Sequence, residues 1–308
     1  MSTSRILTIE VLALLILLLD GLQKAPVNGW SNGGSSDYPS DVKYGTHDWI
    51  AEHALDWLPS NEKHFIVNNL NDYLYGTELP DNGTAPGGGI GDKTKHHVYY
   101  FADGSLQDNA SAVRAQTEYN NAVTLYQSGY VANATKKLGV VTHYISDLAS
   151  FGHVMGNKTD WGNATQHNNY EGYVDPRTDN YADNFISLTY DGVLDSISAY
   201  DAALELAFDT TFDAGETYTC VWMEHNYDWD DPAFRNRCEE SIDLAVNLLA
   251  DILHTFYLEA VVPEFPTILI VPVFMVLVTL VLICVKKAKR STWLTGSDFS
   301  DYDGFRAT

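Results

Sequence analysis

The sequence is poor in cysteine and in basic side chains. Three cysteines in 308 residues exclude a disulfide-dense scaffold and a cysteine-rich zinc finger. Only 18 basic residues stand against 41 acidic ones, and a net charge of −23 argues against a nucleic-acid scaffold because phosphate repels such a surface. Alternating patterns typical of β-strands are also scarce. Hydrophobic residues still make up 45% of the chain, which indicates a folded protein.

Two apolar runs indicate export and attachment to a membrane. The run 6–19 follows Arg5 and is too short to span a bilayer comfortably, so we expect 1–29 to be a signal peptide. The alternative is that this segment is not cleaved and remains as a membrane anchor. The run 267–285 is uncharged over 19 residues, which is the length of a transmembrane helix.

The orientation of the chain follows from its basic residues. Four of them lie within 286–290, directly after the second run, and the positive-inside rule makes 286–308 a cytoplasmic tail. Residues 30–262 would then form an extracellular domain, which permits a disulfide between Cys220 and Cys238. Five N-x-Ser/Thr sequons in that domain are typical of an exported glycoprotein. The sequons begin at Asn82, Asn109, Asn133, Asn157 and Asn163.

The outward domain is predicted to be all-α. Apolar residues recur at helical spacing in several stretches. We expect helices at 46–58, 60–75, 110–128, 132–151, 193–208 and 238–260. A glycine-rich loop is expected at 76–95, and loops with short helices at 156–192. No internal repeat is visible, so we predict one multi-helix domain followed by one transmembrane helix.

The segment THYISDLASFGH carries the most informative side chains. His143 and Asp147 are four residues apart, so on a helix both point to one side and can hold one cation. His153 can join only if the helix ends before it, and Gly152 is a suitable stop. The apolar neighbours indicate a buried helix, and buried His and Asp need partners. The alternative is a polar surface strip with a chance pair.

A second pair strengthens the metal interpretation. His167 and Glu171 are again four apart, and with His153 they offer two nitrogens and one carboxylate. Such a set leaves an open position for water, as a catalytic zinc requires. Taken alone, the pair is more often a solvated helix face. Further candidates are His47 in THDWI, Asp81 in ELPDNG and the pair His96-His97 in KHHVYY, while His53, His64, His225 and His254 are expected to be structural.

The order of these residues resembles the zinc-dependent bacterial phospholipase C family, which is related to the single-strand-specific zinc nucleases. A Trp near the mature start is followed by His, Asp, His, His-x3-Asp-x5-His and His-x3-Glu. The resemblance covers roughly 30–255, and HYISDLASFGH is its most specific part, supported by THDWIAEHA and HHVYYFADG. It implies an all-α bundle with three zinc ions in a cleft.

The resemblance also implies a ligand set for each zinc ion. The first would be held by Asp81, His97, His143 and Asp147, the second by His153, His167 and Glu171, and the third by Trp30, His47 and Asp147. The aromatic-rich segment after His97 favours it over His96. Trp30 would bind through its carbonyl and its free α-amine, which cleavage after residue 29 liberates. An amine with a pKa of about 7.7–8.0 can bind metal, whereas an amide nitrogen does not do so readily.

The implied activity is metal-assisted hydrolysis of a phosphodiester. Asp81 would be the base that orients the attacking water, the substrate a phospholipid, and the C-terminal helix the link to the membrane. The acidic and aromatic residues that recognise choline in some members have no clear match, so the headgroup stays open. PEFPT at 263–267 resembles archaeal surface-protein sorting signals, and the tail would then be processed.

Two other functions compete with this one. The first is a single-strand nuclease of the related branch, which Glu171 opposes because that branch typically has Asp there. The short separation of 14 residues between His153 and His167 also resembles the phospholipase branch. The second is a non-catalytic surface protein stabilised by its metals, although structural zinc sites tend to be fully closed by protein ligands.

Overall fold

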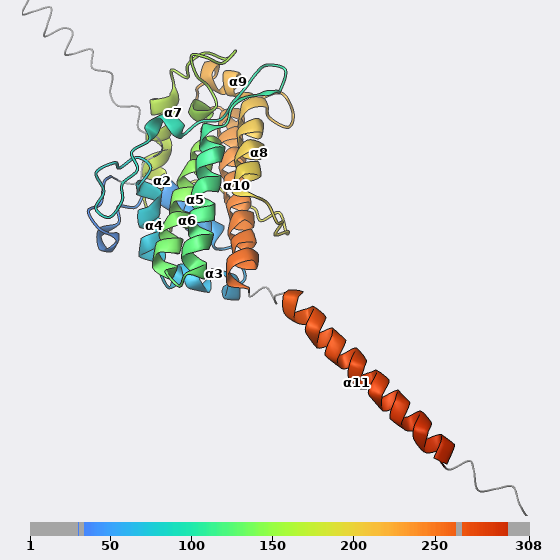
Figure 1. Cartoon of the computed structure of the whole chain (residues 1–308). Coiled ribbons are helices and arrows are strands. Elements are labelled where there is room, and N and C mark those ends of the chain that lie inside the picture. The colour runs from blue at the N-terminus through green and yellow to red at the C-terminus, as the bar shows by residue number, and fades with distance from the viewer. Residues whose placement is uncertain (1–29, 31–33, 263–266, 295–308) are drawn as a thin grey trace, which may run out of the picture. The chain divides into compact units, whose positions relative to one another are not determined.

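The computed structural model describes Trp30, residues 34–262 and residues 267–294 (Figure 1). The predicted signal peptide, most of the sorting-like sequence and most of the predicted cytoplasmic tail lie outside the described residues. The chain divides into two compact units, Met1–Val261 and Val262–Thr308.

The described part of the first unit is mostly helical, which confirms the predicted all-α class. Its α-helices are α2 (Thr46–Ala54), α3 (Ser60–Val67), α4 (Leu70–Glu78), α5 (Ala110–Gln127), α6 (Val131–Ser146), α7 (His167–Val174), α8 (Ala199–Phe212), α9 (Cys220–His225) and α10 (Pro232–Phe256). Shorter 3-10 turns are η1 (Pro39–Asp41), η2 (Lys93–Lys95), η3 (Asp147–Ala149), η4 (Phe151–His153) and η5 (Asp175–Arg177), and a π turn, η6 (Tyr257–Val261), follows α10.

A small antiparallel hairpin, which the sequence analysis did not predict, is the one sheet in the described part of the chain. Its strands are β1 (Tyr99–Tyr100) and β2 (Leu106–Asp108), with Tyr99 opposite Asp108 and Tyr100 opposite Leu106. Two residues and three residues are too few to show a period of two in the sequence.

Local sequence signals explain where several helices begin. The side chain of Ser198 accepts the backbone N–H of Asp201 at the start of α8, and that of Thr219 caps α9 in the same way. Asp231 caps α10, whose first residue is Pro232. Such caps satisfy backbone donors that have no partner inside the helix, and each contributes about 1 kcal/mol.

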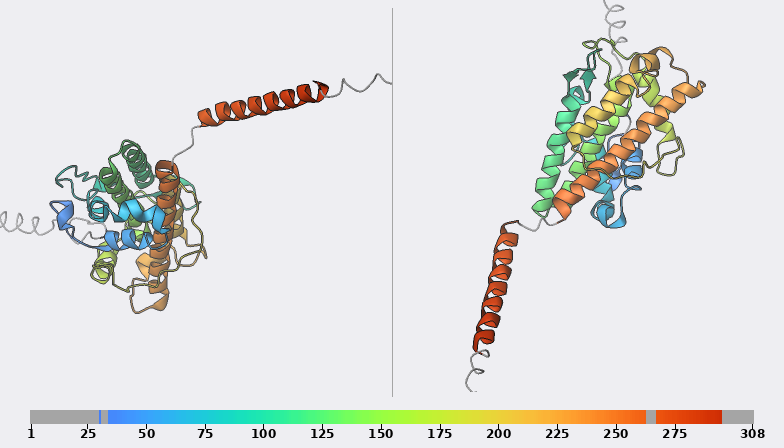
Figure 2. Two further views of the ribbon diagram at one scale, coloured as in Figure 1. Left: turned by 90° about the horizontal axis from the view of Figure 1, so that it is seen from below. Right: turned by 90° about the vertical axis from the view of Figure 1, so that its right-hand side faces the viewer.

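The helices pack into a bundle in which α5 and α6 lie side by side, α4 covers α6, and α10 packs against α2 and α8 (Figure 2). Glycines allow α4 and α6 an unusually close approach. A Cβ built at Gly139 would lie 1.9 Å from the carbonyl oxygen of Tyr73, and one built at Gly76 would lie 2.1 Å from that of Lys136. This approach brings the carbonyl of Thr77, next in α4, within reach of α6.

Several predicted helices differ from the structure. Helix α2 ends at 54 and not at 58, α8 begins at 199 and not at 193, and α10 begins at 232 and not at 238. The stretch 60–75 is broken between α3 and α4, where the Asn69 side chain donates to the Phe65 carbonyl. The helix predicted for 132–151 ends at Ser146, earlier than the stop expected at Gly152, and the extended backbone of Ser150 (φ −91°, ψ 125°) separates η3 from η4. This change of direction turns His153 towards Asp147.

The proposed disulfide is wrong, because Cys220 and Cys238 are both buried free thiols. The hydroxyl of Tyr170 donates to Cys238 Sγ at 3.0 Å. Burial raises the pKa of each thiol to about 12, so both are inert, neutral side chains of the core.

Within its described residues, the second unit contains one helix, α11 (Thr267–Leu294). Its large hydrophobic side chains from Val273 to Val285 are all exposed, at 37% or more. Pro232–Val261, in the first unit, also has the length and composition of a membrane-crossing helix. However, 56% of the apolar window in that stretch is buried, as expected of a core helix.

Candidate metal centre

Four separate parts of the chain bring histidines and carboxylates together. They are the start of α2, the loop from α4 to β1, the end of α6 with η3 and η4, and the start of α7. Three groups have ligand atoms within 4.8 Å of one another: His47, His143 and Asp147; Asp81, His96 and His143; and His153, His167 and Glu171. Since His143 belongs to two of the groups, the first two are contiguous.

Asp147 lies at the middle of these groups and is fully buried. Its Oδ1 is 3.3 Å from His47 Nε2 and 3.6 Å from His153 Nε2. Its Oδ2 is 3.2 Å from His143 Nε2 and 3.0 Å from His96 Nδ1. Through these contacts, one carboxylate reaches imidazoles of all three groups.

Three of the imidazoles are held by their Nδ1 atoms. His143 Nδ1 donates to the Thr77 carbonyl at 2.6 Å, and His153 Nδ1 donates to the His96 carbonyl at 2.7 Å. His47 Nδ1 is 2.6 Å from the hydroxyl oxygen of Ser146. A carbonyl can only accept, so the proton of a neutral ring sits on Nδ1 and the Nε2 lone pair faces the carboxylates. Fixing the tautomer in this way is what metal-binding histidines require.

The third group is more compact than the others. Glu171 Oε1 is 2.6 Å from His167 Nε2 and 3.2 Å from His153 Nε2. Gly152 provides the space for the His167 ring, because a Cβ at position 152 would lie 2.1 Å from its Cδ2 atom. Two nitrogens and one carboxylate therefore converge, as the four-residue spacing on α7 predicts.

The donor atoms of the groups fit divalent cations. Several buried atoms have no hydrogen-bond partner, although a buried polar atom without one is costly. These atoms include His47 Nε2, Asp81 Oδ1, both carboxylate oxygens of Asp147, and Glu171 Oε2. Imidazole nitrogens with carboxylate oxygens are ligands that zinc prefers, and cations bound in the three groups would satisfy these atoms.

The charges within the cluster are strongly coupled. Burial disfavours the ionised forms, but Asp147 and Asp92 raise the pKa of His96 to about 10, and Asp147 and Glu171 raise that of His153 to about 9. Burial would raise the pKa of Asp147, yet the surrounding histidines hold it well below its ordinary value. Burial lowers the pKa of His143. Positive charge is thus needed beside Asp147, and cations can supply it in place of protons.

The structure places His96, and not the predicted His97, in the group with Asp81 and His143. His96, which is 3% exposed, lies 3.7 Å from Asp81 through Nδ1. The adjacent His97 points elsewhere, with its Nε2 3.3 Å from Asp108 and its ring stacked on Tyr99. Because the residues are neighbours in an irregular segment, their order in the sequence did not reveal which one faces the cluster.

Trp30, which is predicted to bind through its α-amine and carbonyl, lies beside His47. It is fully buried, its ring centroid is 6.4 Å from that of His47, and it stacks on Tyr170 at 6.3 Å. Sequence reasoning missed the residues that hold the ligands, namely Ser146, the Thr77 carbonyl and Asp92, which lies 3.6 Å from His96. Ser146 and Thr77 act across long stretches of chain and so have no sequence signal, whereas Asp92 lies only four residues before His96.

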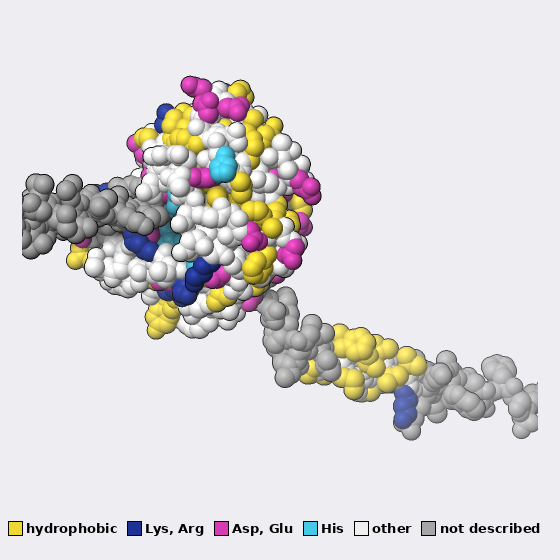
Figure 3. All heavy atoms as spheres, turned by 90° about the horizontal axis from the view of Figure 1, so that it is seen from above, with side chains coloured by type: hydrophobic (Ala, Val, Ile, Leu, Met, Phe, Trp, Pro, Cys, Tyr) yellow, Lys and Arg dark blue, Asp and Glu magenta, His cyan; other side chains and the backbone are white. Residues whose placement is uncertain are grey.

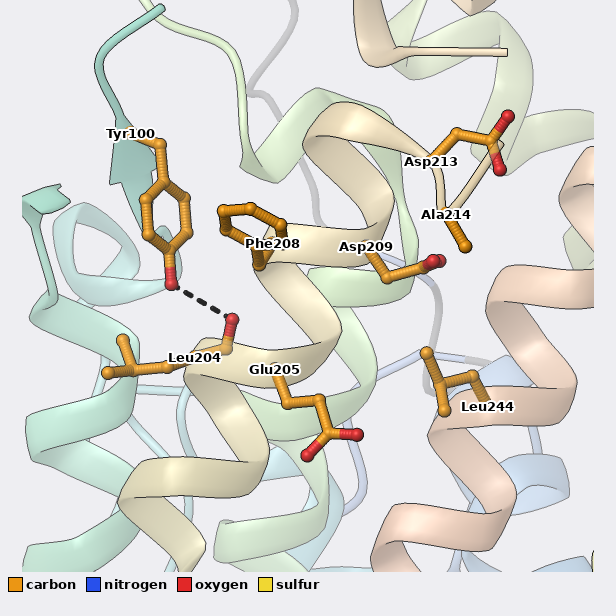
Figure 4. Close-up of a pocket in the computed structure, with 8 residues that line it drawn as sticks. All are labelled: Tyr100, Leu204, Glu205, Phe208, Asp209, Asp213, Ala214 and Leu244. Carbon is orange, nitrogen blue, oxygen red and sulfur yellow. Dashed lines mark hydrogen bonds between the residues drawn. The ribbon is translucent and has the colours of Figure 1, made fainter. Parts of the chain in front are cut away.

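A separate hollow lies between the hairpin, α8 and α10 (Figure 4). Its volume is about 560 Å³, and no member of the three groups lines it. The lining residues are Tyr100, Leu204, Glu205, Phe208, Asp209, Asp213, Ala214 and Leu244. There the hydroxyl of Tyr100 donates a hydrogen bond to the Leu204 carbonyl, so this hydroxyl has a structural role.

Residues 46–244 match the model of a family described as zinc dependent phospholipase C. The chain belongs to that family. The match takes in every residue of the three groups. The family assignment and the buried donor set therefore agree on zinc as the cofactor.

Known proteins support the assignment at lower similarity. Phospholipase C of Listeria monocytogenes is 26% identical over 161 residues, which are 48% of this chain and 54% of the relative. This chain thus spans about half the length of that relative. The alpha-toxin of Clostridium perfringens (avian strain SWCP) is 15% identical with a TM-score of 0.50, over 77% of this chain and 67% of the toxin chain. That likeness concerns the fold.

Proposed function

We propose that this protein is a phospholipase C, which hydrolyses the phosphodiester between a lipid and its polar headgroup. The products would be diacylglycerol, or its archaeal diether counterpart, and a phosphorylated headgroup. The observation that carries the proposal is the buried Asp147 carboxylate, with four imidazoles within 3.6 Å and no hydrogen-bond partner on either oxygen. A carboxylate in that setting binds cations, and membership of the zinc-dependent family supports cation binding here.

The three groups suit three zinc ions, with Asp147 shared between two of them. Bound zinc would supply positive charge that stabilises the developing charge on phosphorus and makes a water molecule more acidic. Asp81 Oδ1 is buried without a hydrogen-bond partner while the side chain is 15% exposed, so this carboxylate reaches from the cluster towards solvent. We assign it the role of orienting the attacking water and taking its proton.

The α-amine of Trp30 is proposed to complete the group of His47 and Asp147. Its support is the buried ring of Trp30 beside His47. The proposal requires cleavage after Gly29, because only a free terminal amine has a lone pair available near neutral pH. N-terminal sequencing of the secreted protein would test it, and a mature chain that starts at another residue would contradict it.

We further infer that the catalytic domain is held outside the cell by a membrane helix at 267–285. The support is the exposed apolar side chains of Val273–Val285, followed by Lys286 and Lys287. A tethered domain acts on lipid that lies within its reach. Protease treatment of intact cells tests this: loss of the domain is expected, and protection would contradict it.

The activity is tested with zinc-loaded protein and two kinds of substrate. Phospholipid should release diacylglycerol and a phosphorylated headgroup, and single-stranded DNA should not be cut. The domain carries 35 acidic and 11 basic residues between 30 and 262, which opposes a nucleic-acid substrate. Cleavage of DNA alone would favour the related nuclease function, and full zinc content without either activity would favour a structural role.

A further inference from the structure

The start of α7 is held by a carboxylate from another helix. Glu224, on α9, accepts the backbone N–H of Thr165 through Oε1 at 2.8 Å and that of Gln166 through Oε2 at 3.1 Å. The hydroxyl of Thr165 also donates to Oε1. Gln166 is the N-cap residue of α7, and His167 is the first residue of the helix. Both oxygens of Glu224 therefore bind the two residues that precede a candidate zinc ligand.

Helix α7 has no cap of its own. The side chain of its N-cap residue, Gln166, makes no capping hydrogen bond, and the helix is only eight residues long. Isolated helices of that length are marginal in water, so α7 depends on its surroundings. A helix start exposes backbone donors and carries partial positive charge, which makes an anionic side chain favourable there. Glu224 supplies from α9 what the N-cap side chains supply in α8, α9 and α10.

The position of α7 decides the geometry of the third ligand group. His167 and Glu171 lie on this helix, whereas His153 ends η4. Glu171 Oε1 is 2.6 Å from His167 Nε2 and 3.2 Å from His153 Nε2, so the carboxylate must meet imidazoles of two elements. Zinc bonds to nitrogen and carboxylate oxygen are about 2.0–2.2 Å long. A small displacement of α7 would therefore separate its two ligands from the one on η4.

The helix that carries Glu224 is anchored in the core. Cys220 and Met223, on the same side of the bundle as α7, are buried at 0% and 3% exposure. In Figure 1, α7 and α9 lie at the same end of the bundle. Figure 3 looks onto that end and shows small areas of histidine surface, in agreement with the burial of His153 and His167. Glu224 thus links a largely buried ligand group to a fixed support.

We propose that Glu224 is a positioning residue for the zinc ion of the third group. It acts through the backbone of Thr165 and Gln166 on the helix that carries His167 and Glu171, and it is not itself a ligand. The inference rests on the proposed function in one respect, since the ion that Glu224 secures is one of those proposed to take part in phosphodiester hydrolysis. Its effect must be confined to one ion and must depend on the ligands of that group.

The test is a competition titration in which a chromogenic chelator removes zinc from the full chain in neutral detergent. Glu224→Gln keeps the size of the side chain but replaces one acceptor oxygen by an amide donor, and Glu224→Ala removes both oxygens. Loss of an outer partner of a zinc site typically weakens metal binding about 10- to 100-fold. We expect one zinc ion to bind about tenfold more weakly in Glu224→Ala, and less so in Glu224→Gln, while the other ions keep the affinity of the parent. Glu205→Ala removes an exposed carboxylate from α8 and should change no ion.

A double-mutant cycle shows whether Glu224 acts through its ligand group. His167→Ala removes a ligand and so identifies the ion of that group, and adding Glu224→Gln to it should weaken zinc binding no further. If Glu224→Ala does not fold, the cycle with Glu224→Gln decides the question. Equal weakening of every ion, an additive effect in the cycle, or unchanged zinc binding would overturn the role of Glu224. Zinc is measured without lipid, so a protein that gives the expected titrations but hydrolyses no phospholipid would disprove the proposed function alone.

Discussion

Replacing Gly152 by alanine should disable the third ligand group through a single methyl group. Gly152 lies in η4 between Phe151 and His153, and its backbone is not in the left-handed region. Alanine is therefore compatible with the backbone, and the consequence comes from contact alone. The new Cβ would lie 2.1 Å from Cδ2 and 2.3 Å from Cγ of the His167 ring.

The size of the effect follows from these distances. Ordinary contact begins at 3.4 Å, so the ring must retreat by more than about 1 Å. The ring has little room, because His167 is buried and its Nε2 is 2.6 Å from Glu171 Oε1. A displacement of about 1 Å at a catalytic group costs on the order of 100-fold in rate. We expect Gly152→Ala to lose one zinc per chain and about 100-fold in kcat/KM.

Gly172→Ala is the matched control. Gly172 follows Glu171 on α7, and a Cβ there would have no heavy atom within 4 Å. This change should stabilise the helix by roughly 0.5–1 kcal/mol and leave zinc and activity intact. Zinc is counted by mass spectrometry and activity by headgroup release. If Gly152→Ala kept the zinc content and the turnover of the parent protein, the assignment of His167 as a zinc ligand would be refuted.

Three further experiments test other parts of the structure. Asp147→Asn should lose at least one zinc and nearly all turnover, because an amide cannot replace the charge shared by the groups; retained zinc and activity would refute the sharing. His96→Ala should lower zinc content whereas His97→Ala should not, and the reverse result would restore His97 as the ligand. Asp251 tests how the stability of the fold depends on pH. Burial raises its pKa to about 6, above the unfolded value of about 3.9. Its contribution to the free energy of unfolding is therefore fully present at low pH, where the side chain is protonated, and is lost as the pH rises from about 4 to about 6. Asp251→Asn keeps an acceptor for the Asp195 N–H and should raise the free energy of unfolding by about 1–2 kcal/mol at pH 7.5, allowing for solvent screening, and by little at pH 4. Urea denaturation measures this difference, and an equal gain at both values would contradict it.

Residues that share a helix were the most predictable part of the site. The pairs His143 with Asp147 and His167 with Glu171 follow from a spacing of four residues. The second pair lies on α7, and Asp147 is the C-cap residue of the helix that carries His143. The stretch 110–128 was equally clear and corresponds to α5 within one residue. Local periodicity determines these features, so no knowledge of the tertiary structure was needed.

The irregular segments could not be predicted in the same way. The orientation of His96 depends on the path of the loop after α4, which backbone bonds such as Ile90 N–H to Leu79 carbonyl fix. Helix α6 ends early, at Ser146, and the chain continues into η3, which is held by tertiary packing. No helix-breaking residue marks this end in the sequence. Likewise, the Thr77 carbonyl meets His143 only because two glycines let α4 and α6 approach closely.

An anomalous-difference map at the zinc absorption edge, from crystals of the zinc-loaded protein, would test the metal centre most directly. We expect one peak in each of the three groups, with His nitrogens and carboxylate oxygens at about 2.0–2.2 Å, and with Asp147 bound to two of the ions. Zinc peaks at other positions, or an Asp147 that binds none, would contradict the central claim.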